Sequence, residues 1–280
     1  MKRRMISGII AAVLFLLIIF SPKEIFNIAC ALIAALAVYE VFGAFRAKGF
    51  KPSYYAGYTA CLCIFLGSIE YWDRRVWKWL RDIILFVDIR FLLYLSLLLM
   101  FFFLITGRGK YTVSDLSVTI LGAFYVCYLF WYLIMARNLY GGEFAVLFVA
   151  VSAVATDTGA YFIGTWLGKH KLLPDISPNK TVEGAIGGAL ACIATVTLYG
   201  VFVFDKYAYA NPVWLYAIMG TACGLVAQVG DLAASCIKRY CGVKDFGKLI
   251  PGHGGLLDRI DSAILLSPLI YIFLTVMQKV

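Results

Sequence analysis

The residues best suited to chemistry lie in one stretch near the carboxyl end of the chain, residues 235–261. This stretch holds five cations, three carboxylates and one of only two histidines. Gly252, Gly254 and Gly255 flank His253, so the backbone there can come close to a ligand. Cations and backbone amides bind oxyanions, and carboxylates bind metal ions. The stretch therefore predicts a site for a metal-bound polyphosphate.

A second polar cluster begins inside an apolar run, at Asp157. An ionised carboxylate at the bilayer centre costs at least about 2.5–3.5 kcal/mol on insertion scales, so Asp157 should face a wet cavity or a partner. Asp157 and Tyr161 share a helix face, which Gly164 and Gly168 continue. The alternative interpretation is helix packing through these small residues, with one structural hydrogen bond at Asp157.

Asp231 stands where an apolar run leaves the membrane, and it is a candidate metal ligand. If the helix continues there, Asp231, Ser235 and Lys238 share one face at i, i+4 and i+7, with Arg239 beside them. A carboxylate, a hydroxyl and two cations would then point the same way. The alternative is a helix end whose two cations reach lipid headgroups.

Asp258 and Asp261 are three residues apart and would face one site if residues 258–266 were helical. Gly254 and Gly255 would then free N–H groups at that helix start for an oxyanion. Neighbouring carboxylates repel unless a cation lies between them. Mg²⁺ is the natural cation, because it takes one or two protein carboxylates and completes its shell with phosphate oxygens and water. Mn²⁺ could substitute for Mg²⁺. A second cation such as K⁺ is also possible, because pairs of metal ions recur at sites where a phosphate group is transferred.

Two further residues of the stretch have open roles. Asp245 could be a metal ligand or could pair with Lys244 or Arg259. His253 could hold a phosphate, move a proton or cap the glycine turn. Phosphate contact is favoured, since the chemistry implied below needs no strong base.

Residues 235–261 resemble the signature of the phosphatidate cytidylyltransferases, also called CDP-diacylglycerol synthases. That signature runs Ser-x-apolar-Lys-Arg, four residues, Lys-Asp, and then Pro-x-His-Gly-Gly-x-x-Asp-Arg-x-Asp. Its fixed positions are filled by Ser235, Lys238, Arg239, Lys244, Asp245, Pro251, His253, Gly254, Gly255, Asp258, Arg259 and Asp261.

Residues 157–184 resemble the second motif block of the same family, an Asp followed by Ala-Tyr-Phe and Gly, and then Ser-Pro-x-Lys-Thr-x-Glu-Gly. Asn179 stands where many members carry Lys, which removes one cation but leaves Lys180, Thr181 and Glu183. Over the first 140 residues the resemblance is only architectural.

The resemblance implies that the phosphate of phosphatidic acid attacks the α-phosphorus of CTP, giving CDP-diacylglycerol and pyrophosphate. A phosphate monoester dianion is already nucleophilic, so the main demands are positioning and charge neutralisation. The expected catalytic residues are Lys238, Arg239, Lys244, Asp245, His253, Asp258, Arg259 and Asp261. The expected substrate contacts are Asp157, Ser177, Lys180, Thr181, Glu183, Ser235, Gly254 and Gly255. The expected Mg²⁺ ligands are Asp231, Asp258 and Asp261.

The expected partners are CTP, phosphatidic acid and the lipid bilayer, with no nucleic acid, and the family suggests a homodimer. Two other functions stay open. One is a cytidylyltransferase or kinase that acts on another lipid phosphate or lipid alcohol. The other is a transporter or channel with Asp157 and Asp231 on an ion path, although no repeated halves with broken helices are seen.

The elements that must position these residues are membrane helices. The chain is 62% hydrophobic and 15% charged, with a mean hydropathy of +0.87, whereas a soluble domain is about 45–50% apolar and about 25% charged. The net charge of +9 suits work beside anionic lipid and nucleotide phosphate. The eight cysteines form no CxxC pair, so core packing is favoured over a disulfide framework or metal cluster.

Nine apolar runs predict an all-α, polytopic fold with about nine transmembrane helices. They cover residues 5–20, 25–45, 54–69, 91–105, 116–136, 144–167, 184–204, 213–229 and 262–277. The first run lacks a small-x-small cleavage site, so it predicts a helix rather than a cleaved signal. We expect one domain over 1–280, with an N-terminal bundle over 5–136 and a catalytic part over 144–280. The catalytic part would carry cytoplasmic loops 168–183 and 230–261.

Lysines and arginines predict the orientation. With the N terminus in the cytoplasm, sixteen of them fall in inside segments and eight outside. Both motif-bearing loops then face the cytoplasm from the cell membrane. One basic loop, residues 72–82, falls outside. The spacing of Trp72, Val76, Trp79 and Leu80 predicts an amphipathic helix lying in the interface, and a wrong topology is the alternative.

Overall fold

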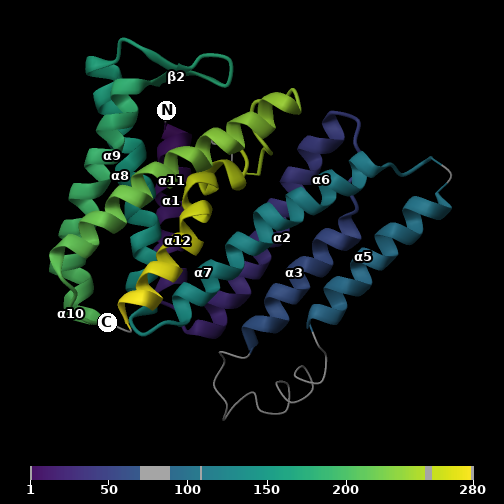
Figure 1. Cartoon of the computed structure of the whole chain (residues 1–280), viewed down its shortest axis with the longest axis horizontal. Helices are drawn as coiled ribbons and strands as arrows, with labels where there is room; N and C mark the ends of the chain where they lie inside the picture. Colours follow the sequence, from purple (N-terminus) through teal and green to yellow (C-terminus); the bar gives the residue numbers. More distant parts are fainter. Residues whose placement is uncertain (1, 70–88, 108, 250–253, 279–280) are drawn as a thin grey trace. The chain divides into compact units, whose positions relative to one another are not determined.

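The computed structural model describes residues 2–69, 89–107, 109–249 and 254–278, and most of these residues are helical (Figure 1). They also form one short antiparallel hairpin, in which β1 (Lys171–Leu173) pairs with β2 (Ser177–Thr181). The predicted all-α class is confirmed, with this hairpin as a small addition. The amphipathic helix predicted at 72–82 lies outside the described residues.

Five helical runs are long and apolar enough to cross a membrane: Lys23–Ala47, Val113–Asn138, Gly142–Leu167, Val182–Tyr207 and Val213–Tyr240. Shorter apolar helices cover Ile10–Ile19, Leu93–Thr106 and Asp261–Met277. The chain is therefore a multi-pass membrane protein. That nine helices cross the bilayer, and that the N terminus faces the cytoplasm, stay predictions.

The chain divides into two compact units. The first comprises residues 1–134 and 240–258, and the second comprises residues 135–239 and 259–280. The predicted division into an N-terminal bundle and a catalytic part stays a prediction. The helices of the first unit are α1 (Lys2–Ile19), α2 (Lys23–Ala47), α3 (Tyr54–Ser68), α5 (Ile89–Thr106), α6 (Val113–Ala123), the π-helical turn η2 (Phe124–Tyr128) and most of α7 (Leu129–Asn138).

In the first unit, α2 packs against α3 and α6 around the ring of Phe42, which is fully buried. A Cβ added to Gly57 of α3 would lie 2.6 Å from the Phe42 ring, and one added to Gly122 of α6 would lie 2.7 Å from it. Glycine therefore lets both helices approach the ring. On another side of α2, Leu32 and Leu36 are exposed, as expected of lipid-facing side chains.

The second unit is built on two helices that run side by side, α8 (Gly142–Leu167) and α9 (Val182–Tyr199) (Figure 1). A Cβ on Gly188 would lie 2.7 Å from the carbonyl oxygen of Thr156, so small residues bring these backbones together. The hairpin links the two helices. The remaining elements are η3 (Gly200–Phe204), α10 (Asp205–Tyr207), α11 (Val213–Tyr240) and α12 (Asp261–Met277).

Candidate active site

In the first unit, Asp258 holds the loop that follows α11. This segment, residues 241–258, is the motif loop. Oδ2 of Asp258 accepts hydrogen bonds from the amides of Phe246, at 2.9 Å, and Gly255, at 3.0 Å. Asp258 itself lies in the 3₁₀ turn η4 (Leu257–Arg259). One carboxylate thus draws together the start and the end of the loop.

The carboxylates of Asp245 and Asp258 flank Gly254. Gly254 has φ +86°, a left-handed conformation that favours glycine. A Cβ there would lie 3.3 Å from the carboxyl group of Asp245 and 3.3 Å from Oδ2 of Asp258. Within the described loop Asp245 forms no ion pair with Lys244. Two carboxylates this close favour a cation beside them, which supports the ligand interpretation of Asp245.

Glu40 of α2 also reaches this loop, and the sequence reasoning missed it. Its two carboxylate oxygens accept the amides of Leu256 and Leu257, each at 2.9 Å. Glu40 lines a cavity of about 310 Å³ together with residues 246–249 of the loop. The signal was present, because Glu40 is a lone carboxylate within the apolar run 25–45, as Asp157 is in its own run.

In the second unit, the hairpin brings Lys180 of β2 to Asp231 of α11. Nζ of Lys180 and Oδ2 of Asp231 form an ion pair, and both side chains are about a quarter to a third exposed. Asp157 of α8 lies close enough for the charges of both to act on it. The structure thus gathers three predicted site residues from three elements.

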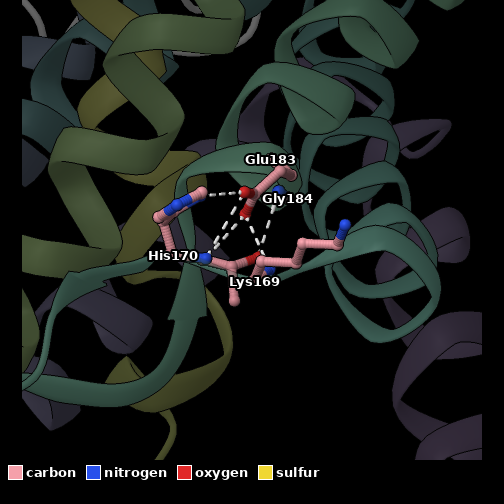
Figure 2. Close-up of polar contacts among 5 residues, drawn as sticks. Lys169, His170, Glu183 and Gly184 are labelled. Carbon is pink, nitrogen blue, oxygen red and sulfur yellow. Dashed lines mark hydrogen bonds and ion pairs between the residues drawn. The ribbon is translucent and has the colours of Figure 1, made fainter.

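Glu183 binds the hairpin to the start of α9, as Figure 2 shows. Its carboxylate accepts the backbone amides of Lys169, at 3.1 Å, and His170, at 3.2 Å. It also lies 2.6 Å from Nδ1 of the exposed His170 ring. The side chain of Thr181 caps the same helix by accepting the amide of Gly184 at 3.1 Å. Glu183 and Thr181, both predicted substrate contacts, thus shape the turn that presents Lys180.

Helix α11 continues to Tyr240, so Asp231, Ser235 and Lys238 do lie on one continuous helix. Nζ of Lys238 lies 3.8 Å from Oδ2 of Asp261, and both side chains are largely buried. Asp261 also accepts the amide of Ser262 through Oδ1, at 2.8 Å. A second lysine–carboxylate pair therefore joins α11 to the first turn of α12.

The predicted helix over 258–266 is wrong at its start. α12 begins at Asp261, after a non-helical Ile260, and Asp258 lies in the separate 3₁₀ turn. Of the oxyanion cradle predicted at Gly254 and Gly255, the structure accounts for the amide of Gly255, and the part at Gly254 stays a prediction. The amides of residues 255, 256 and 257 are donated to carboxylates of the protein, so they do not face an incoming phosphate.

The other predicted residues lie as follows. Ser177 begins β2, Ser235 is half-buried on α11, and Lys244, Arg239 and Arg259 are exposed. Nε of Arg239 donates to the carbonyl oxygen of Ile176 in the hairpin turn, at 3.4 Å. His253 lies outside the described residues. Within the part of the chain that the structure describes, no three His, Cys, Asp or Glu side chains gather as a metal site.

Lysine–carboxylate pairs in a multi-pass membrane protein suit phosphate chemistry at a bilayer. Residues 2–277 match the cytidylyltransferase family, and the chain belongs to that family. The phosphatidate cytidylyltransferase of Bacillus subtilis (strain 168) is 32% identical over 277 residues, which cover 98% of this chain and 97% of the relative. The proteins of the same name from Staphylococcus saprophyticus and Staphylococcus aureus (strain COL) are each 32% identical over 98% of this chain and 99% of their own.

Proposed function

We propose that the chain transfers CMP from CTP to phosphatidic acid, giving CDP-diacylglycerol and pyrophosphate, as a step in phospholipid biosynthesis. The observation that carries the proposal is the end-to-end similarity to relatives named phosphatidate cytidylyltransferase. It is supported by two motif blocks whose lysines and carboxylates lie together in the described structure.

The lysines of the second unit are the groups we assign to phosphate oxygens. Lys180 and Lys238 each face a carboxylate through side chains alone, so each can exchange that partner for a phosphate oxygen without moving the backbone. Because Lys180 is partly exposed, a phosphate can reach it. Arg239, Lys244 and Arg259 would then hold the triphosphate and stabilise the departing pyrophosphate.

The carboxylates fit Mg²⁺ by their chemistry, since this ion prefers oxygen ligands. We assign the ion to Asp231, Asp258 and Asp261, with Asp245 as a neighbour of Asp258, although the described structure does not gather three such side chains as a metal site. A carboxylate has about four lone-pair sites, so accepting amide hydrogen bonds leaves it capacity for a cation. Bound Mg²⁺ would neutralise charge on the triphosphate, Mn²⁺ could replace it, and a second cation such as K⁺ could share the site.

We place the chain in the cell membrane with nine crossings, and with its N terminus, hairpin and motif loop facing the cytoplasm. The Lys and Arg distribution supports this orientation, as does the cytoplasmic supply of CTP. Apolar side chains such as Phe162 and Trp166 are exposed on α8. They would face lipid and let the acyl chains of phosphatidic acid stay in the bilayer. We also propose a homodimer, as the family resemblance suggests.

One assay tests the proposed function. Purified protein in lipid vesicles is given labelled CTP and phosphatidic acid, with and without Mg²⁺. ATP, or another lipid phosphate, replaces the substrates in matched reactions. We expect Mg²⁺-dependent CDP-diacylglycerol from CTP and phosphatidic acid. A preference for ATP, or for another lipid phosphate as acceptor, would contradict the proposal.

A further inference from the structure

Glu40 is a buried carboxylate on a helix that is otherwise apolar. Its side chain is 3% exposed, and it sits in α2 among Ala37, Val38 and Val41, which are fully buried. A carboxylate in such surroundings is costly unless it is hydrogen-bonded. Glu40 therefore has to be explained by its partners.

Those partners belong to the motif loop, far along the chain. Oε1 of Glu40 accepts the amide of Leu256 and Oε2 accepts that of Leu257, across 216 and 217 residues of sequence. The contact is tight, since a Cβ on Gly255 would lie 2.7 Å from Oε2. A Cβ on Gly247 would meet the same carboxylate even more closely. Two glycines of the loop thus make room for Glu40.

Glu40 and Asp258 together take up the polar backbone of the loop. The successive amides 255, 256 and 257 point at these two carboxylates, and amide 246 joins them from the start of the loop. This arrangement fixes the turn at Gly254, beside which the carboxylates of Asp245 and Asp258 lie. Both oxygens of Glu40 are occupied by amides, so its contribution to the reaction must be indirect.

We propose that Glu40 is a positioning residue of the transferase site, which holds the loop so that Asp245 and Asp258 face the same point. The inference rests on the proposed function of the chain. It also gives the first unit's α2, where the family resemblance is only architectural, a direct part in building the site.

The test uses two substitutions that act on the same contact and one matched control. Glu40→Gln places an amide NH₂ group against a backbone N–H, so at least one hydrogen bond is lost. Gly247→Ala keeps the charge of Glu40 but pushes its carboxylate. Gly43→Ala is the control, because it lies on α2, lines the same cavity, and its added Cβ would meet nothing within 4 Å.

Each purified variant is assayed for turnover, for the Michaelis constant of CTP and for Mg²⁺ activation, and its amide exchange is followed by mass spectrometry. We expect kcat to fall about 100-fold in Glu40→Gln, as for a misplaced reacting group, with the Michaelis constant of CTP nearly unchanged. Gly247→Ala should show the same pattern, and the double variant should lose less than the product of the two effects. Exchange should quicken over residues 254–258 while residues 142–167 keep their protection.

Normal turnover in Glu40→Gln with faster exchange in the loop would overturn the positioning role. So would losses in the double variant that multiply fully, since the two changes would then not act on one contact. If Glu40→Gln does not fold, Gly247→Ala alone decides, by the same split between kcat and the Michaelis constant. The wild type could make no CDP-diacylglycerol while the variants still exchange faster than the wild type over residues 254–258. That result would refute the proposed function and leave the contact between Glu40 and the loop standing.

Discussion

Two sets of carboxylates near the proposed site are held in different ways. In the first unit, Glu40 and Asp258 accept backbone amides of the motif loop. In the second unit, Asp231 faces the side chain of Lys180, and Asp261 faces that of Lys238 while also accepting the amide of the next residue, Ser262.

The difference distinguishes a fixed part of the proposed site, Glu40 and Asp258, from an exchangeable part, the pairs Lys180–Asp231 and Lys238–Asp261. A carboxylate bound to backbone amides determines the path of the chain, so its loss moves every residue of the loop. A carboxylate paired with a lysine can give up that partner when a phosphate and a cation arrive, and the backbone stays where it is. We therefore expect substitutions at Glu40 and Asp258 to change geometry and those at Asp231 and Lys180 to change charge.

The largest effect should come from Asp258→Asn. The substitution removes the negative charge that a cation needs and also disturbs the pair of amide hydrogen bonds at Oδ2. We expect near-complete loss of turnover in a protein that still folds and inserts into the membrane. Turnover is measured over a range of Mg²⁺ concentrations, with Asp175→Asn in the exposed hairpin turn as the control.

Activity above about a tenth of wild type, a loss of less than about 1.4 kcal/mol of barrier lowering, would show that Asp258 is not a metal ligand. Faster amide exchange over residues 254–258 with an unchanged Mg²⁺ requirement would assign Asp258 to the fixed part of the site alone.

A smaller effect is expected at Lys180, in the exchangeable part. Lys180→Ala and Arg239→Ala should each reduce turnover strongly, and the double variant should fall short of the product of the two losses, because both act on one substrate complex. Lys180→Arg should restore activity only in part, since a forked guanidinium does not replace a compact ammonium. Lys171→Ala, an exposed lysine of the same hairpin, is the control.

Multiplicative losses at Lys180 and Arg239 would remove residues 177–184 from the site. The same conclusion would follow if Lys180→Ala changed membrane behaviour or stability but left turnover and the Michaelis constants nearly as in wild type.

The sequence predicted the second unit's cluster better than the first unit's loop. Helical spacing from Asp231 to Lys238 is a local property, so it could be read from the chain once the helix was assumed to continue. The loop depends on Glu40, which is more than two hundred residues away in sequence, and no local pattern links the two. The helix expected from residue 258 was wrong for the same reason, since partners distant in sequence determine the path of this loop.

The smallest effect on activity is expected from cysteine substitutions that test the orientation of the chain in the membrane. The proposed site requires that its residues face the cytoplasm. Cysteines placed at Lys171 and Lys248 should be labelled from the cytoplasm by a membrane-impermeant reagent, and one placed at Lys206 from the opposite side. These side chains are exposed or nearly so, and turnover of the variants should stay close to that of the wild type. Labelling of position 248 from outside would refute both the topology and the nucleotide site.

Transfer of a cytidylyl group to a lipid phosphate can be observed by following the phosphorus atoms of CTP. Purified protein in vesicles of phosphatidic acid is given Mg²⁺ and CTP labelled either at the α-phosphorus or at the γ-phosphorus, and lipid and aqueous products are separated. We predict α-label in the lipid and γ-label in aqueous pyrophosphate. Label from the γ-phosphorus in the lipid would instead identify the protein as a kinase and refute cytidylyl transfer.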